Sequence, residues 1–181
     1  MYTGHFAVAL TGAGVSRRIP VALLIVAAFA SDLVEGGIAL LNVRDSTRVW
    51  SHSLPAATAA GALLAVGWKL FGGTFRECAV VCIVAMSHTL LDFVTATKTV
   101  WPGVAPMGLN LYARPYVDGI VEVVFCIVGW FVWRRSVAHV QWRRPLAWAP
   151  LIVLLLAQTA ATARLIYGGP IDFDALSKFV R

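Results

Sequence analysis

The chain has 181 residues, of which 59% are hydrophobic and only 13% are charged, and its mean hydropathy is +0.77. A soluble domain is about half apolar and about a quarter charged, so too few polar residues remain here to cover a globule in water. The composition therefore predicts an integral membrane protein, and the length predicts one domain over residues 1–181. The net charge of +6 forms no basic stripe with interleaved aromatic residues, which argues against a nucleic-acid partner.

Apolar stretches in chain order predict the fold. A membrane-spanning helix needs about 20 mostly apolar residues. The stretches that reach or approach this length are Ile19–Leu41, Leu54–Phe71, Glu77–Thr97, Tyr116–Trp133 and Leu146–Tyr167. The apolar run Thr3–Val15 is too short to span and is expected to lie against the bundle as a short or half-depth helix. The predicted fold class is all-α: a polytopic membrane bundle of about five transmembrane helices plus a short N-terminal helix.

The start of the chain imitates a cleavable signal peptide. Arg17 and Arg18 precede an apolar run that ends in Ala28-Phe29-Ala30. Apolar sequence continues on both sides of this pattern, which a signal peptide does not need, so we expect no cleavage.

Basic residues predict the orientation, because loops on the cytoplasmic side carry an excess of Lys and Arg. Every adjacent pair of arginines falls on one side of the predicted topology, at Arg17-Arg18, Arg134-Arg135 and Arg143-Arg144. The basic residues of the other side are single: Arg44, Arg48, Lys98 and Arg114. The side with the pairs is expected to be cytoplasmic, and the location an inner cell membrane.

Ionisable residues within the spans gather in the half of the membrane away from the arginine pairs. They are Asp32, Glu35, His52, His88, Asp92 and Asp118, and His5 joins them if the short helix runs inward towards Arg17. His88 and Asp92 are four residues apart, and Asp32 and Glu35 are three apart, so each pair shares a helix face. Because such residues are costly in a bilayer, we interpret the group as one functional site.

The residue types indicate a metal. Imidazole nitrogen together with carboxylate oxygen is the ligand set of a divalent transition ion such as Zn, Mn or Fe. A cation would also allow neighbouring carboxylates to stay ionised, and it would activate a water for hydrolysis near neutral pH. The alternative is that these side chains only hydrogen-bond between helices. We expect Glu122 to pair with Arg114 or Arg135, and His139 to be a solvated loop residue.

Four short motifs resemble a known family. They are Gly4-His5, Ser31-Asp32-x-x-Glu35, Arg48-x-x-Ser51-His52-Ser53 and Ser87-His88-x-x-x-Asp92-x-x-Thr95. In order and approximate spacing they resemble the bacterial and archaeal membrane-bound predicted metal-dependent hydrolases, over residues 4 to 118. The resemblance implies that His5, Asp32, His52, His88 and Asp92 are the metal or catalytic residues, and it adds Asp118 to the site. We expect these five residues to hold the metal, and the ligand types favour Zn or Mn. Val34, Glu35, Thr47 and Val49 depart from the family pattern.

The sequence thus predicts a membrane-embedded hydrolase that acts on an ester or phosphoester of an amphiphilic substrate, such as a lipid or lipid phosphate. Asp118 or Glu35 would serve as an outer ligand or as general base. Two alternatives stay open: a metal-ion or proton transporter that uses the same residues, and a non-catalytic membrane adaptor in which the polar residues only join helices.

Overall fold

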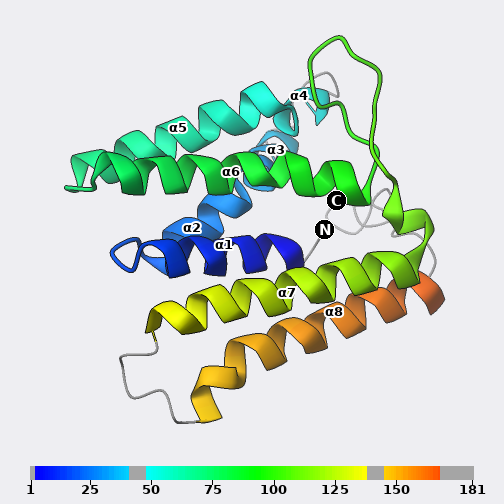
Figure 1. Ribbon diagram of the computed structural model, residues 1–181. Coiled ribbons are helices and arrows are strands. Elements are labelled where there is room, and N and C mark those ends of the chain that lie inside the picture. The colour runs from blue at the N-terminus through cyan, green and yellow to red at the C-terminus, as the bar shows by residue number, and fades with distance from the viewer. Residues whose placement is uncertain (1–2, 41–47, 138–144, 168–181) are drawn as a thin grey trace.

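The structure is a computed structural model that describes residues 3–40, 48–137 and 145–167 (Figure 1). Its helices are α1 (Thr3–Val15), α2 (Val21–Ala28), α3 (Ala30–Leu40), α4 (Arg48–Ser51), α5 (Leu54–Leu70), α6 (Phe75–Thr95), α7 (Pro115–Val137) and α8 (Ala149–Tyr167). Short 3-10 turns precede α7 and α8, at Leu111–Ala113 and Pro145–Trp148. Over the described residues, the all-α class predicted from the sequence is confirmed.

Among the described residues, three helices are long and apolar enough to cross a membrane: α6, α7 and α8. The bent pair α2 and α3 would make a fourth span if it crosses as one unit. Helix α5 has 17 residues. At 1.5 Å per residue it is about 26 Å long, slightly less than the roughly 30 Å of a bilayer's hydrocarbon core. The fifth span therefore stays a prediction that depends on α5.

The first predicted span is not one continuous helix. Ile19–Leu41 was expected to run unbroken, but the helix breaks at Phe29, and α2 and α3 meet there at an angle of 61°. The break involves neither Pro nor Gly. It lies beside a contact from another helix, since the backbone oxygen of Ala28 accepts a hydrogen bond from Nδ1 of His88 over 2.8 Å. Sharp kinks are typical where a side chain enters the backbone hydrogen-bond ladder.

Helix α1 lies inside the bundle, between α6 and α7 (Figure 1), and not against its outer surface as expected. Its buried positions carry mostly small residues: Thr3, Gly4, His5, Ala7, Ala9, Gly12 and Ala13. On the α7 side, a Cβ atom added at Gly129 would overlap the backbone of Ala7. Small residues let two helix backbones approach closely, and this close contact holds α1 in the centre.

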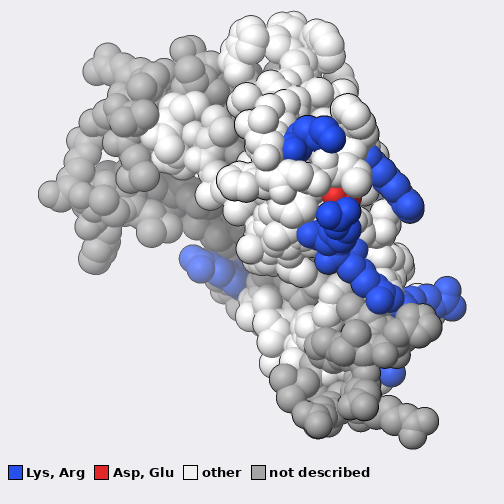
Figure 2. Space-filling view, turned by 90° about the vertical axis from the view of Figure 1, so that its left-hand side faces the viewer, with Lys and Arg blue, Asp and Glu red and all other residues white. Residues whose placement is uncertain are grey.

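The two ends of the bundle differ in charge. The turn from α1 to α2, the turn from α5 to α6 and the end of α7 lie together at one end (Figure 1). Figure 2 looks onto this end and shows Lys and Arg side chains gathered there, with little Asp or Glu. Arg143 and Arg144 lie outside the described residues. The starts of α1, α5 and α7 and the end of α6 lie at the opposite end, which holds the predicted site residues.

An apolar core fills the bundle between the two ends. Its buried members are Ala9, Ala13, Ile19, Leu24, Ala27, Ala28, Ala65, Val81, Val84 and Ala85. At the basic end, Glu77, the third residue of α6, forms a capping box with Thr74, and its carboxylate lies 3.8 Å from Arg18. Glu77 therefore has a structural role in starting this helix.

Candidate metal centre

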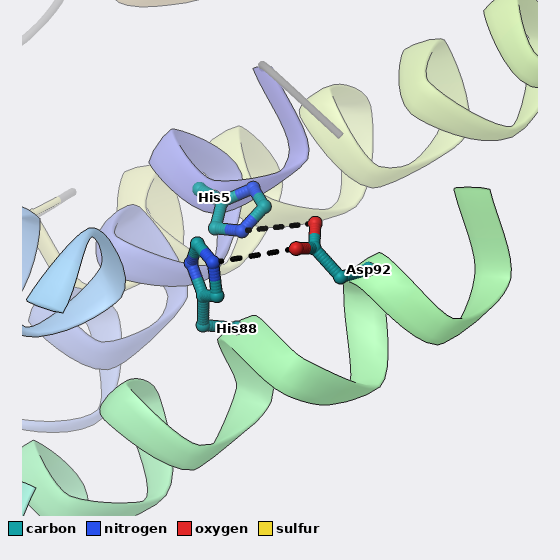
Figure 3. Close-up of side chains that lie close together, drawn as sticks. All are labelled: His5, His88 and Asp92. Atoms are coloured by element: carbon teal, nitrogen blue, oxygen red, sulfur yellow. Dashed lines mark ion pairs between the residues drawn. The ribbon is translucent and has the colours of Figure 1, made fainter. Parts of the chain in front are cut away.

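Five predicted ligands from separate parts of the chain meet at one end of the bundle. His5 comes from α1, Asp32 from α3, His52 from the turn before α5, and His88 and Asp92 from α6. Ligand atoms of His5, His88 and Asp92 all lie within 4.8 Å of one another, as do those of Asp32, His52 and His88. Figure 3 shows the first group, with the His5 ring above His88 and both rings facing the Asp92 carboxylate.

The position of His88 follows from the break between α2 and α3. Its Nδ1 contacts the carbonyl oxygen of Ala28, and a carbonyl can only accept, so Nδ1 carries the proton. In the neutral ring Nε2 then has a free lone pair. This nitrogen is buried, has no hydrogen-bond partner among the described residues, and lies 3.5 Å from Oδ2 of Asp92. The bend therefore orients His88 as a ligand, because metal-binding imidazoles commonly donate their other N–H to a carbonyl or carboxylate.

His52 is oriented in a similar way. Its Nδ1 lies 3.1 Å from Oε2 of Glu35 and 3.0 Å from Oγ of Ser51. Its Nε2 faces the cluster, 3.1 Å from Oδ1 of Asp32. Thr89 on α6 donates a hydrogen bond to the backbone oxygen of His52 over 3.1 Å, which fastens this turn to the helix that carries His88.

Four imidazole–carboxylate distances in the cluster are close to those between the ligands of one ion. Nε2 of His52 and Nε2 of His88 are each 3.5 Å from Oδ2 of Asp92, and they are 3.1 and 3.6 Å from Oδ1 of Asp32. Ligands at about 2.0–2.2 Å from a tetrahedral Zn²⁺ are about 3.3–3.6 Å apart. The observed distances fall in or close to that range. Each of the two imidazoles therefore lies at a ligand-like distance from both carboxylates, and His88 belongs to both of the ligand groups that could hold a metal ion.

His5 lies on the other side of Asp92. Its ring is 1% exposed, and neither nitrogen has a hydrogen-bond partner among the described residues. The ring stacks on Phe29 and meets His88 edge-on, at centroid distances of 5.2 and 4.2 Å. Its Nε2 is 3.9 Å from Oδ1 of Asp92 (Figure 3). A buried imidazole without hydrogen bonds is costly, and a bound cation would satisfy it.

The cluster is open on the side of Asp32. The side chains of His5, His52 and His88 are at most 5% exposed, whereas those of Asp32 and Lys98 are 49% and 36% exposed. Nζ of Lys98 is 3.9 Å from Oδ2 of Asp92. No motif of the sequence places Lys98 in the site, because its contact with Asp92 depends on the loop after α6.

Asp118 does not join these ligands in the described contacts. It lies on α7, one turn from Glu122, and its Oδ1 is buried without a hydrogen-bond partner among the described residues. Glu122 accepts hydrogen bonds from the backbone nitrogens of Thr3 and Gly4 and from the Thr3 hydroxyl, over 2.7 to 3.2 Å. The partners predicted from the sequence were Arg114 or Arg135, whereas these hydrogen bonds join Glu122 to α1. They place a carboxylate at the N-terminus of α1, where negative charge is favourable. His139 lies outside the described residues.

Comparisons with family models, with curated proteins and with solved structures find no match for this chain. The resemblance of the four motifs to the hydrolase family therefore stays a prediction, and the geometry of the cluster carries the argument for function.

Proposed function

We propose that this protein is a multi-pass enzyme of the inner membrane that holds a divalent transition ion, Zn or Mn, and hydrolyses an ester or phosphoester of an amphiphilic substrate. The observation that carries the proposal is the convergence of Nε2 of His52, Nε2 of His88 and the Asp32 and Asp92 carboxylates at the spacing of ion ligands. A helix-joining role alone would not leave Nε2 of His88 buried without a hydrogen bond to any residue that the structure describes.

The residues have separate roles in this proposal. His52, His88, Asp32 and Asp92 hold the ion, and Glu35 keeps Nε2 of His52 directed at it by contacting Nδ1. His5 lies next to Asp92 and has no hydrogen-bond partner within residues 3–40, 48–137 and 145–167, so it is placed to bind the ion as a further ligand or to carry a proton. A bound ion of this kind supplies Lewis-acid polarisation and lowers the pKa of a water.

The depth of the cluster favours an amphiphilic substrate. Asp92 and His88 lie three and seven residues before the end of α6 at Thr95. At 1.5 Å per residue they are about 4.5 and 10.5 Å below the helix end, near the boundary between headgroups and hydrocarbon. A lipid ester or lipid phosphate carries its cleavable bond at about this depth.

A metal-ion or proton transporter is the second candidate, and the apolar core argues against it. A transporter binds its cargo near the midplane and needs polar groups on towards the other side. Here Val84, Ala85 and Ala28 lie directly next to His88 or within a turn of it, and the core continues with apolar side chains towards the basic end. Ion flux into liposomes without substrate turnover would favour the transporter.

The first experiment is metal analysis by mass spectrometry of the detergent-purified protein beside the double variant His88→Ala/Asp92→Ala. We expect about one equivalent of transition metal per chain in the wild type and none in the variant. A hydrolase screen on lipid esters and phosphoesters would follow with the metal-loaded protein. If a folded wild type takes up no metal from Zn or Mn solutions, the enzyme proposal is wrong, and the adaptor interpretation takes its place.

A further inference from the structure

The loop between α6 and α7 places one cation at the open side of the cluster. Lys98 and Met107 pair as an isolated antiparallel bridge, with backbone hydrogen bonds of 3.1 and 2.9 Å in the two directions. The backbone nitrogen of Leu54 donates to Val100, and that of Leu109 donates to Phe93, each over 2.8 Å. The loop is therefore fastened to the start of α5 and to the end of α6, the two segments that flank His52 and Asp92.

This anchoring determines where the Lys98 side chain can reach. Its Nζ lies 3.9 Å from Oδ2 of Asp92, the oxygen that also faces His52 and His88. The side chain is 36% exposed, so the ammonium group stands between the buried ligands and the outside. The ion pair with Asp92 therefore holds the ammonium group at the opening of the cluster, although a half-exposed lysine could otherwise extend into water.

The charges at the site change when an ion binds. Asp32 and Asp92 together carry two negative charges, which a divalent ion balances. Glu35 is engaged with Nδ1 of His52. Lys98 and the ion then share the Asp92 carboxylate, so this one carboxylate has to offset positive charge on both sides. An anionic substrate group that touches both the ion and Nζ would be attracted by both positive charges.

We propose that Lys98 recognises a phosphate group of the substrate, so that the enzyme acts on phosphoesters and not on neutral esters. This inference rests on the proposed function, because it requires the ion. A lysine ammonium binds phosphate as a point charge, and phosphate has several oxygens, so one can face the ion while another accepts a hydrogen bond from Nζ. A neutral carboxylic ester has no comparable charge to occupy this position. The phosphate could belong to a lipid headgroup or to a water-soluble phosphoester.

The test uses the full chain in detergent, loaded with Co²⁺, desalted and titrated with inorganic phosphate while the visible absorption of the cobalt is recorded. We expect Lys98→Ala to bind phosphate about tenfold more weakly than wild type or worse, and Lys98→Arg to remain close to wild type. Metal content in Lys98→Ala should be unchanged, because removing a neighbouring positive charge does not weaken cation binding. Lys69→Ala is the matched control, since Lys69 lies at the end of α5 that carries the basic residues.

The outcomes separate the two proposals. If the wild type binds no metal, both the proposed function and the role of Lys98 are wrong. If metal binds but phosphate binds wild type and Lys98→Ala equally, only the role of Lys98 is wrong. Nanodiscs of phosphatidylcholine with and without phosphatidic acid then identify the source: a Lys98-dependent spectral change with phosphatidic acid indicates a lipid phosphate, and a change with inorganic phosphate alone indicates a soluble phosphoester.

Discussion

Glu35 offers the sharpest test of how the candidate centre is built, because it contacts Nδ1 of His52, the ring nitrogen that faces away from the proposed ion. Its Oε2 lies 3.1 Å from Nδ1 of His52, while Nε2 of the same ring faces Asp32 and Asp92. We expect Glu35→Gln to weaken metal binding while the number of bound ions stays the same. The carboxylate stabilises the ligating tautomer of His52 and makes its Nε2 a stronger donor to the ion.

The expected magnitude follows from the contact. A hydrogen bond to a charged group contributes about 1.5–3 kcal/mol, roughly twice a neutral one. Replacing the carboxylate by an amide thus removes about 0.7–1.5 kcal/mol, which raises the metal dissociation constant by about 3- to 13-fold. The Ser51 hydroxyl, 3.0 Å from Nδ1, remains available to the imidazole and keeps the loss in the lower part of this range.

Competition with a coloured zinc chelator measures the dissociation constant, and Glu77→Gln serves as the control. Glu77 is also a buried carboxylate, but it caps α6 at the opposite end, so its loss should affect stability and leave metal affinity unchanged. Complete loss of metal in Glu35→Gln would refute the reasoning, because Glu35 would then be a direct ligand. An unchanged dissociation constant with lost turnover would instead make it the general base.

Three further predictions concern the same end of the bundle. Metal analysis should show that His88→Ala binds no metal and that His5→Ala retains a bound ion, because His88 belongs to both ligand groups and His5 to only one. Equal loss of metal in both variants would contradict this. Glu122→Ala should lower the thermal unfolding temperature more than Glu122→Gln does, since it leaves the backbone N–H groups of Thr3 and Gly4 without their acceptor at a cost of about 1–3 kcal/mol. Gly129→Val should displace α1 and cost about 1–3 kcal/mol in the same assay; unchanged stability would show that α1 does not need this close approach.

Much of the site could be predicted because depth along a span can be counted in residues. His88 and Asp92 are one helical turn apart on α6, and the direction of each helix follows from the alternation of spans and loops. From the depth and the direction of each span, the sequence predicts that His5, His52 and Asp32 lie at the end of the bundle away from the arginine pairs. The all-helical class followed equally directly from the apolar stretches.

Asp118 and Glu122 show the limit of this counting. Asp118 has the right depth for the cluster, but depth does not say which neighbouring helix a side chain faces. It lies on α7 with Glu122, whose carboxylate contacts the first turn of α1. Which residues of two helices meet depends on packing between parts of the chain more than 100 residues apart, and a single sequence contains no record of that pairing.

The sequence by itself determined the apolar helices, the segregation of basic residues to one end and the set of imidazoles and carboxylates near the other, because these depend only on composition and on the repeat of the helix. The tertiary structure decided the break at Phe29, the central place of α1, the contact of Glu35 with His52 and the approach of Lys98 to Asp92. Each of these depends on a contact between distant segments, such as the hydrogen bond from His88 to Ala28, that no local pattern encodes.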